Sequence, residues 1–386
     1  MKKVLLAVDT GFDGCKFCIN GMVIDIPFAI LDITGKDGNF MTHRDADNFI
    51  RSEIDGETYL LGSRAKTSLL ESSQIAQAHQ MDTFYTIGRF KMREYKIALK
   101  SFLCYALCKY EEYSAKTDKD PFTVTALNEG KVELFVGSAL PHSQRDEIWE
   151  ESVLPALLEP IKLNISVGDA DPVFFDFQLT EDNLCMNSQV ISAMFAVTLD
   201  ENGNYKPDCI AENMLPMLVL DLGYLTGGIF LLSKDGRVVF ADSNQEFAMH
   251  NVNERVANIV KEHRSDITSF NIETLAKKKE TVRYSKEVDG QTIFDAYDIE
   301  TLRNEEIKRA AENLNRYLFM KFNNLLDIKS IIVAGGTGGL YYEYLEPEYK
   351  KRMIESKLAE PEMNSEKTEP VFAVVIGLYR SMLPLF

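Results

Sequence analysis

Short apolar runs separated by turn residues predict strands at the start of the chain. Val4–Val8 is fully apolar and runs into a polar turn that contains glycine. Apolar residues resume over Cys15–Ile19, and Asn20-Gly21 is a strong hairpin signal before a further strand at Met22–Pro27. Phe49–Leu61 repeats this pattern around an Asp-Gly turn. We therefore predict that the chain opens with an antiparallel, hairpin-rich sheet.

Apolar residues at helical spacing predict a long helix at Phe90–Tyr113 and a buried helix at Asn187–Val197. The polar stretch Ala359–Pro370 contains two prolines and is predicted to be a surface loop. Further strands are predicted at Val132–Val136, Leu215–Leu220 and Ile331–Ala334, hairpins at Ile229–Phe240 and Thr281–Asp295, and helices at Asn251–Lys261, Ile272–Lys279, Asn304–Leu326 and Phe372–Leu383. This mixture of strands and helices is typical of the α/β class.

The first part of the chain and its middle share one pattern. A strand, an Asp-x-Gly turn and a second strand open the sequence, and the same succession returns near residue 215. The 386 residues are enough for two or three domains. We therefore expect two halves that are built on the same α/β plan.

Charge limits the partners that this protein can bind directly. The chain has 42 basic and 59 acidic side chains, a net charge of −17, which argues against an extensive contact with DNA phosphates. The longest basic run, Lys277-Lys278-Lys279, is flanked by Glu273 and Glu280 and is interpreted as a solvated helix face. We find no apolar run of the ~20 residues that a membrane span needs. Asp9 cuts the first apolar run too short for a signal peptide, so we expect a cytoplasmic protein without membrane contact.

Cysteine and histidine give no sign of a disulfide framework or a metal site. Six cysteines in a chain of this length are too few for a disulfide scaffold. Cys15 and Cys18 lie in a strand pattern, where their spacing directs the two sulfurs to opposite faces. Cys104 and Cys108 share an apolar helix face and are interpreted as core thiols. The five histidines are scattered without the spacing of metal ligands.

Three glycine-rich turns, each after an apolar strand, indicate phosphate binding. Glycine lets backbone N–H groups approach a phosphate closely, and Lys16 can add a point charge. Asp9 and Asp221 can hold the water shell of an Mg²⁺ ion that bridges phosphates. The run Gly335–Gly339 joins a strand to a helix and suits an α-phosphate and a purine base. The chain has neither a P-loop motif nor a GxGxxG motif after its first strand, which argues against those two nucleotide-binding classes.

Taken together, the motifs resemble those of actin over nearly the whole chain. Val4–Lys16 is similar to the first phosphate loop of actin, Val219–Gly227 to the second, and Ile331–Gly339 to the adenosine motif. Asn187–Ala193 and Ala373–Gly377 fall where actins have their two connecting helices. The sequence is therefore identified as a member of the actin superfamily, which also contains sugar kinases and chaperone ATPases.

Two further segments resemble the ParM/StbA group, the bacterial actins of plasmid partition. Ile54–Gly62 is similar to their strand pair with the pattern DG-x-x-Tyr-x-x-Gly. Phe135–Pro141 is similar to their strand ending in Gly-x-Leu-Pro, with one inserted residue. This resemblance implies a filament that assembles head to tail with bound triphosphate and disassembles after hydrolysis. It also implies plasmid DNA segregation through a basic DNA-binding adaptor of the ParR type, without direct contact to nucleic acid.

The fold implied by the resemblance is an α/β, actin-like two-domain fold. Each half would be a ribonuclease-H-like mixed sheet with helices, and the nucleotide would lie in the cleft between the halves. Domain I would span 1–180, with a small subdomain at about 33–62, and would be completed by a C-terminal helix at 371–386. Domain II would span 181–370, with a small subdomain at about 245–300.

The resemblance also assigns roles to individual residues. Gln189 would orient the attacking water, Asp221 would act with it in catalysis, and Asp9 and Asp221 would hold Mg²⁺ through water. Glu273 could accept hydrogen bonds from the ribose and Lys277 could lie near the base, with solvated surface charges as the equal alternative for both. The expected ligand is ATP or GTP, and ADP or GDP after hydrolysis. The residues expected to bind it are Asp9, Thr10, Gly11, Phe12, Lys16, Gly223, Tyr224, Thr226, Glu273, Lys277, Gly335, Gly336, Thr337 and Gly338.

Two departures from the actin pattern keep alternatives open. Tyr224 and Leu225 stand in the second loop where small or acidic residues are usual, and Phe12-Asp13 replaces small residues in the first loop. A non-hydrolysing scaffold or a small-molecule kinase of the same superfamily therefore remains an alternative. Filament contacts are expected on exposed loops such as Gly35–Phe49 and the tyrosine-rich stretch Tyr341–Lys351. A partly buried helix is the alternative for the tyrosine-rich stretch.

Overall fold

The computed structural model describes residues 1–12, 14–35, 49–71, 87–207, 214–289 and 291–386. By its contacts, the chain divides into two compact units. Unit 1 comprises Met1–Tyr205, Pro361–Thr368 and Phe372–Phe386, and unit 2 comprises Lys206–Glu360 and Glu369–Val371. The chain passes from unit 1 to unit 2 after Tyr205, whereas we expected a change of domain after residue 180; the expected domains stay a prediction.

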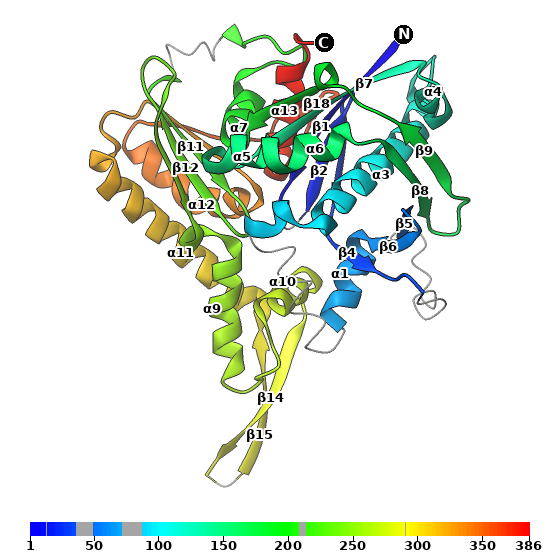
Figure 1. Cartoon of the computed structure of the whole chain (residues 1–386). Helices are drawn as coiled ribbons and strands as arrows, with labels where there is room; N and C mark the ends of the chain where they lie inside the picture. Colours follow the sequence, from blue (N-terminus) through cyan, green and yellow to red (C-terminus); the bar gives the residue numbers. More distant parts are fainter. Residues whose placement is uncertain (13, 36–48, 72–86, 208–213, 290) are drawn as a thin grey trace. The chain divides into compact units, whose positions relative to one another are not determined.

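Unit 1 is built on a mixed sheet with the strand order β10-β7-β1-β2-β3 (Figure 1). β1, β2 and β3 form an antiparallel meander, whereas β7 and β10 run parallel to β1. The strands are β1 (Lys2–Thr10), β2 (Cys15–Ile19), β3 (Met22–Ile26), β7 (Val132–Leu140) and β10 (Leu184–Ser188). The antiparallel start is therefore confirmed for the first three strands.

The hairpin predicted at Phe49–Leu61 belongs to a second sheet, so our prediction of one opening sheet is wrong. This antiparallel sheet has the order β4-β6-β5-β8-β9. Its strands are β4 (Ile30–Asp32), β5 (Ile50–Ile54), β6 (Glu57–Leu61), β8 (Ile161–Val167) and β9 (Val173–Phe177). The hairpin lies in this sheet because β5 pairs with β8, a strand more than a hundred residues downstream. The local sequence pattern of a strand does not show which distant strand it pairs with.

Helices α7 and α13 pack against each other in unit 1, and α13 also contacts β1, β2 and β7. Gly377 permits this close approach, because a Cβ atom there would collide with the carbonyl oxygen of Ser192. The helices of unit 1 are α1 (Gly62–Glu71), α3 (Arg93–Thr117), α4 (Val124–Asn128), α5 (Arg145–Ile148), α6 (Leu154–Leu158), α7 (Gln189–Thr198) and α13 (Ala373–Met382), with single turns at Ile87–Lys91, His142–Gln144, Trp149–Val153 and Glu181–Asn183. Cys104 and Cys108 are buried in α3, as expected.

Unit 2 has a mixed sheet with the corresponding strand order, β13-β12-β11-β16-β17. Its first three strands form an antiparallel meander, and β16 and β17 continue the sheet in parallel with β11. The strands are β11 (Met217–Leu222), β12 (Gly227–Leu232), β13 (Val238–Asn244), β16 (Ser330–Ala334) and β17 (Glu355–Leu358). The prediction of two halves on one α/β plan is therefore confirmed.

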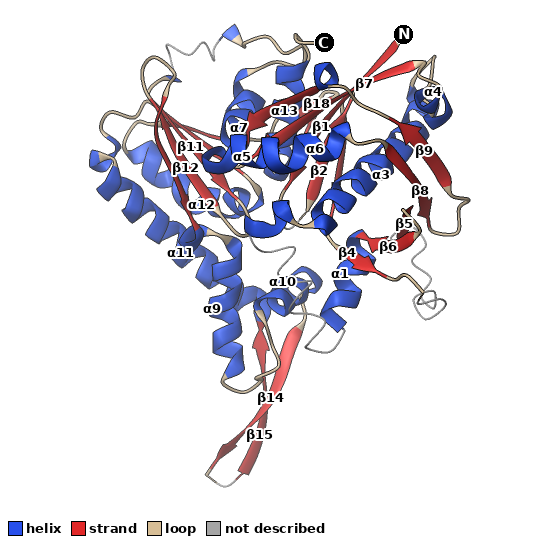
Figure 2. Ribbon diagram, in the orientation of Figure 1, coloured by secondary structure: helices blue, strands red, loops and turns tan. Residues whose placement is uncertain are grey.

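A helical layer and a long hairpin complete unit 2. The hairpin of β14 and β15 projects beyond α9 and α10 (Figure 2). The elements are α9 (Met249–Lys261), α10 (Ser269–Lys278), β14 (Thr281–Val288), β15 (Gln291–Asp298), α11 (Ile299–Lys321) and α12 (Gly336–Lys351), with single turns at Gln245–Phe247 and Asn323–Leu325 and another at Pro370–Phe372 where the chain returns to unit 1. Lys277, Lys278 and Lys279 are exposed at the end of α10, as expected of a solvated face.

The tyrosine-rich stretch is not an exposed interface loop, so that prediction is wrong, whereas the alternative of a partly buried helix is confirmed. It forms most of α12, and Tyr341 and Tyr349 are fully buried. Their spacing of eight residues, with Leu345 between them, puts all three on one helix face, which packs into the core of unit 2. The other stretch expected to make filament contacts lies outside the described residues, apart from its ends.

The polar stretch Ala359–Pro370 is a surface loop only in part. It contains the short hairpin β18 (Glu362–Met363) and β19 (Glu366–Lys367), and Ala359 and Met363 are buried. Asn364 donates a hydrogen bond of 3.2 Å from Nδ2 to the carbonyl oxygen of Gly21. This hydrogen bond holds the hairpin against the turn between β2 and β3 in unit 1.

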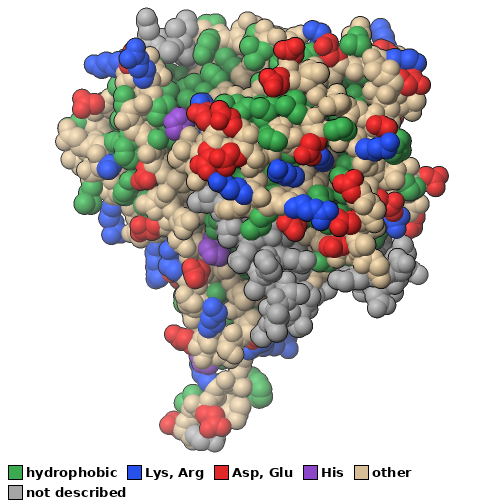
Figure 3. Space-filling model, viewed as in Figure 1, with side chains coloured by type: hydrophobic (Ala, Val, Ile, Leu, Met, Phe, Trp, Pro, Cys, Tyr) green, Lys and Arg blue, Asp and Glu red, His purple; other side chains and the backbone are tan. Residues whose placement is uncertain are grey.

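Among the described residues, no helix combines the length and the apolar character that crossing a bilayer requires. On the face shown in Figure 3, acidic side chains lie interspersed with the basic ones.

Candidate functional site

The first glycine-rich turn begins at the end of β1, in the interior of unit 1. Asp9 pairs with Lys16 across the antiparallel strands β1 and β2. Both side chains are almost fully buried, with 7% and 8% of their surface exposed. The hairpin thus places the carboxylate of Asp9 and the ammonium group of Lys16 on adjacent strands, close to the start of the turn.

The carboxyl group of Asp9 is held by charge and by a hydrogen bond. Burial raises its pKa, while the positive charge of Lys16 and the hydrogen bond from Gln189 act in the opposite direction. Gln189 begins α7, and its Nε2 atom lies 2.8 Å from Oδ1 of Asp9. Because the amide nitrogen donates to Asp9, the Oε1 atom of Gln189 points the other way and can accept a hydrogen bond.

Close packing within the turn requires glycine at position 11. A Cβ atom on Gly11 would lie 2.9 Å from the carbonyl oxygen of Gly14 and 3.3 Å from Nζ of Lys16. Lys16 itself donates to the carbonyl oxygen of Gly14 at 3.2 Å. The turn is therefore folded tightly around the lysine ammonium group.

Arg89 also contacts this turn, and sequence reasoning did not single it out. Its guanidinium group donates to the carbonyl oxygen of Thr10 and, at 3.1 Å, to that of Gly11. The ring of Phe12 lies 4.1 Å from the guanidinium carbon. Arg89 lies almost eighty residues downstream in the sequence, and a single arginine after a polar stretch carries no signal that could have linked it to the turn.

The second glycine-rich turn follows β11 in unit 2, and hydrogen bonds to its carbonyl oxygens hold it in place. The N–H of Gly223 donates to the carbonyl oxygen of Thr226 at 2.9 Å, which closes the turn. The carbonyl oxygen of Gly223 accepts from Oγ1 of Thr337 at 2.7 Å and from the N–H of Met249 at 3.3 Å. The carbonyl oxygen of Tyr224 accepts from the N–H of His250 at 2.7 Å. The first two N–H groups of α9, which have no partner within that helix, are thereby satisfied by the turn.

The third turn, between β16 and α12, lies against the second. Gly335 has a φ of 82°, a conformation that glycine adopts without strain. A Cβ atom there would collide with the carbonyl oxygen of Leu222 and would lie 3.1 Å from Oδ1 of Asp221. Unit 2 thus brings together the carboxylate of Asp221, the second turn and the start of α12, where Gly336, Thr337 and Gly338 lie.

The unusual residues of the second turn are packed into unit 2. The ring of Tyr224 lies 5.9 Å from that of His250 and 6.5 Å from that of Phe270. Leu225 is buried. The bulk of both side chains is therefore accommodated inside unit 2, and the backbone of the turn keeps its tight geometry.

Glu273 and Lys277 form an ion pair on α10, and Glu273 is also bonded to the two neighbouring helices. Glu273 forms an ion pair of 2.9 Å with Arg303 of α11 and accepts a hydrogen bond of 2.8 Å from Asn253 of α9. Lys277 contacts Glu273 at 3.2 Å and keeps 64% of its side chain exposed. The role of both residues near a nucleoside stays a prediction, and the structure adds that Glu273 joins three helices.

A metal ion bound by the described residues would need ligands besides His, Cys, Asp and Glu side chains. The described residues contain no group of three His, Cys, Asp or Glu side chains that could hold a metal ion. One carboxylate lies at each of two turns, Asp9 in unit 1 and Asp221 in unit 2. A single carboxylate at either turn is enough for Mg²⁺, which usually keeps several water ligands and takes one or two carboxylates together with phosphate oxygens.

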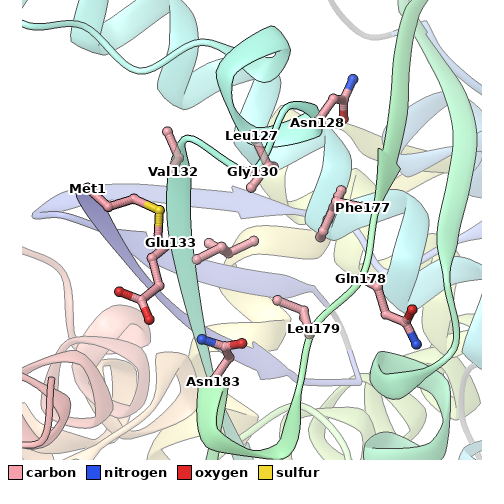
Figure 4. A pocket seen from close by; sticks show the side chains of 11 residues that line it. Met1, Leu127, Asn128, Gly130, Val132, Glu133, Phe177, Gln178, Leu179 and Asn183 are labelled. Carbon is pink, nitrogen blue, oxygen red and sulfur yellow. The ribbon is translucent and has the colours of Figure 1, made fainter.

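Unit 1 also has a pocket of about 310 Å³, which lies away from Asp9 and the first glycine-rich turn (Figure 4). It is lined by Met1, which precedes β1, and by Val132 and Glu133 at the start of β7, whereas Asp9 lies near the end of β1. Polar groups along its wall are already bonded within the chain: Asn128 donates to the carbonyl oxygen of Phe174 and accepts from the N–H of Asp176. We therefore do not assign the nucleotide to this pocket.

The fold is that of known actin-like proteins. The model superimposes on a ParM from a 15-stranded filament of Clostridium botulinum with a TM-score of 0.63 and 16% sequence identity, covering all of both chains. An archaeal actin homologue, Ta0583, gives 0.62 and 14% over 99% of both chains, and Bacillus thuringiensis ParM with ATP gives 0.54 and 15% over 98% of both. No protein-family model and no curated protein matches the sequence. The chain therefore has the actin-like fold, and the resemblance inferred from the motifs is confirmed at that level.

Proposed function

We propose that this protein binds ATP or GTP with Mg²⁺, assembles head to tail into filaments, and hydrolyses the nucleotide so that the filaments disassemble. The observation that carries this proposal is the correspondence between two turns. Each follows the first strand of a sheet with the same strand order, each begins at a buried or half-buried aspartate, and each is fastened through its carbonyl oxygens. A neighbour of the same fold was solved with ATP, and another as a filament.

The hydrogen bonds that the carbonyl oxygens of both turns accept favour phosphate binding there. In a trans peptide the C=O and the following N–H point in opposite directions. Where the carbonyls of Gly223 and Tyr224 are bonded to α9, the N–H groups of Tyr224 and Leu225 therefore point away from that helix. Successive N–H groups that point the same way form a concave site for an anion. We infer that the two turns bind the β- and γ-phosphates.

Asp9 and Asp221 are proposed to hold Mg²⁺ through water. When bound, the ion supplies positive charge that neutralises the phosphate oxygens. Lys16 beside Asp9 adds a further positive charge for the phosphates. The start of α12 and Gly335 are proposed to bind the α-phosphate and the base, with Lys277 on the nucleoside side.

Gln189 is proposed to orient the attacking water. Its amide is fixed by the hydrogen bond to Asp9, which leaves Oε1 to accept a hydrogen bond from a water molecule. A neutral amide orients a water but is a poor base, so hydrolysis should be slow. Slow hydrolysis suits a filament whose lifetime it sets.

The cargo and adaptor are proposed by analogy with the ParM group. The net charge of −17 favours a basic partner over direct contact with DNA. We therefore propose that the filament moves plasmid DNA in the cytoplasm through a basic DNA-binding adaptor of the ParR type.

The test is 90° light scattering of the purified protein after addition of Mg²⁺ with ATP or GTP, with phosphate release followed in parallel. For the wild type we expect a rise in scattering that decays as phosphate appears. Asp221→Ala should give no rise, because the carboxylate beside the second turn is lost. Gln189→Ala should give a rise that persists, with phosphate release slower by about 100-fold.

Matched controls separate these effects from damage to the fold. Asp327→Ala and Gln178→Ala replace exposed side chains of the same kinds and should behave as the wild type. All variants should melt cooperatively within a few degrees of one another. A rise without decay in the wild type would favour a scaffold. No rise with either nucleotide would rule out the filament and direct attention to kinase activity on small acceptors.

A further inference from the structure

We propose that Arg89 is a positioning residue for the phosphates, because it fixes the orientation of two peptide groups in the first glycine-rich turn. This inference rests on the proposed function and adds a residue to it.

The guanidinium group holds two successive carbonyl oxygens. One terminal nitrogen, Nη2, donates to Thr10, and the other, Nη1, donates to Gly11 at 3.1 Å. Within each of these peptide groups the N–H points the opposite way, and these are the N–H groups of Gly11 and Phe12. Among the described residues, no backbone oxygen accepts from either N–H. Arg89 therefore presents two adjacent donors on the side of the turn that faces away from it, which is the arrangement of an anion site.

The surroundings of Arg89 favour an arginine over a lysine. Only 1% of the residue is exposed, so the charge lies in the interior of unit 1. The rings of Phe12, Phe28 and Phe90 lie 4.1, 5.0 and 4.9 Å from the guanidinium carbon, and aromatic faces stabilise a cation that has left water. The planar fork of arginine reaches two carbonyls at once, whereas the single nitrogen of lysine cannot copy that geometry.

Arg89 also adds to the charge at the site. Its buried positive charge lies directly against the turn that follows Asp9. In unit 2 the corresponding carbonyls are bonded to Thr337 and to the N-terminus of α9. In unit 1 both carbonyls accept from the single side chain of Arg89, so one substitution can remove both hydrogen bonds.

The experiment compares the affinities of Mg-ADP and AMP by calorimetry in the wild type, Arg89→Lys and Arg89→Met. Arg93→Lys is the matched control, because Arg93 is exposed and pairs with Glu57. We expect the Kd of ADP to rise about 10-fold or more in both Arg89 variants and the Kd of AMP to change less than about twofold. Equal loss for both ligands would indicate a general structural role and overturn the inference, as would unchanged affinities.

A second measurement does not depend on nucleotide binding. Pyrophosphate is titrated into protein labelled with ¹⁵N-glycine, and the amide signal of Gly11 is followed in the wild type and in Arg89→Lys. A shift in the wild type that is lost in the variant supports the inference even if ADP does not bind, a result that would count against the proposed function alone. A Gly11 signal that responds equally in both proteins would overturn the inference. Melting curves show whether each variant is folded.

Discussion

Cys15 and Cys18 show how burial, rather than motif, sets the chemistry of individual residues here. Both thiols are fully buried on β2, and neither is positioned for a metal site among the described residues. Burial raises the pKa of Cys18 to about 12 and holds that of Cys15 well above its ordinary value. These thiols should therefore stay protonated and unreactive in the folded protein.

A pH dependence of stability follows from the Cys18 thiol. Its pKa is 9.0 in the unfolded chain and about 12 in the folded protein. Above pH 9 the unfolded chain therefore loses a proton that the folded protein keeps. The free energy of unfolding should therefore fall as the pH rises through this window, by up to about 1.4 kcal/mol per pH unit for one such thiol. Urea unfolding at about pH 8 and about pH 10.5 should show a smaller fall for Cys18→Ala than for the wild type. Identical falls in the two proteins would contradict this assignment.

At the scale of elements, the crossing of α7 and α13 links the core of unit 1 to its site. Gly377 lies where a Cβ would meet the backbone of α7, and α7 begins at Gln189, which holds Asp9. The motifs predicted two connecting helices at these positions, but they did not predict that the helices pack against each other. Their contact distance depends on the packing of the whole sheet.

Gly377→Ala should therefore destabilise unit 1 and disturb the site. We expect a loss of about 1–3 kcal/mol in the free energy of unfolding, because the two helices must separate to admit a methyl group. Chemical denaturation measures the loss, and nucleotide affinity should weaken in parallel as Gln189 shifts. Ser381→Ala on the same helix is the control and should change the stability by less than about 1 kcal/mol. A Gly377→Ala variant as stable as the wild type would show that α13 can move without cost.

At the scale of the whole molecule, net charge governs which macromolecules can bind. With 42 basic and 59 acidic side chains, the protein should repel DNA. Fluorescence anisotropy of a labelled duplex should show no binding at micromolar protein and low salt, with or without Mg-nucleotide. Addition of a basic adaptor should confer binding that weakens as salt is raised. Tight, salt-dependent binding of the protein alone would contradict the proposal of an adaptor.

Local chemistry explains why so much of the fold could be predicted. The Asn-Gly and Asp-Gly turns require backbone conformations that few other residues adopt, so the hairpins at Asn20-Gly21 and around Asp289 lay where expected. The strand and Asp-x-Gly succession predicted the repeated plan, since each strand carries its own apolar pattern. Of the proposed site residues, those on the three turns were found by the same local signals.

What only the tertiary structure decided depends on partners that lie far away in the sequence. The assignment of Phe49–Leu61 to a second sheet depends on β8, and the burial of Tyr341 and Tyr349 depends on the core that α12 meets. The contact of Arg89 with Thr10 and Gly11 joins residues whose sequence neighbourhoods share no pattern. The sequence by itself determined the turns, because their conformation depends on the residues within them. Only the fold could determine which side chains fasten those turns, because that depends on which distant segments pack together.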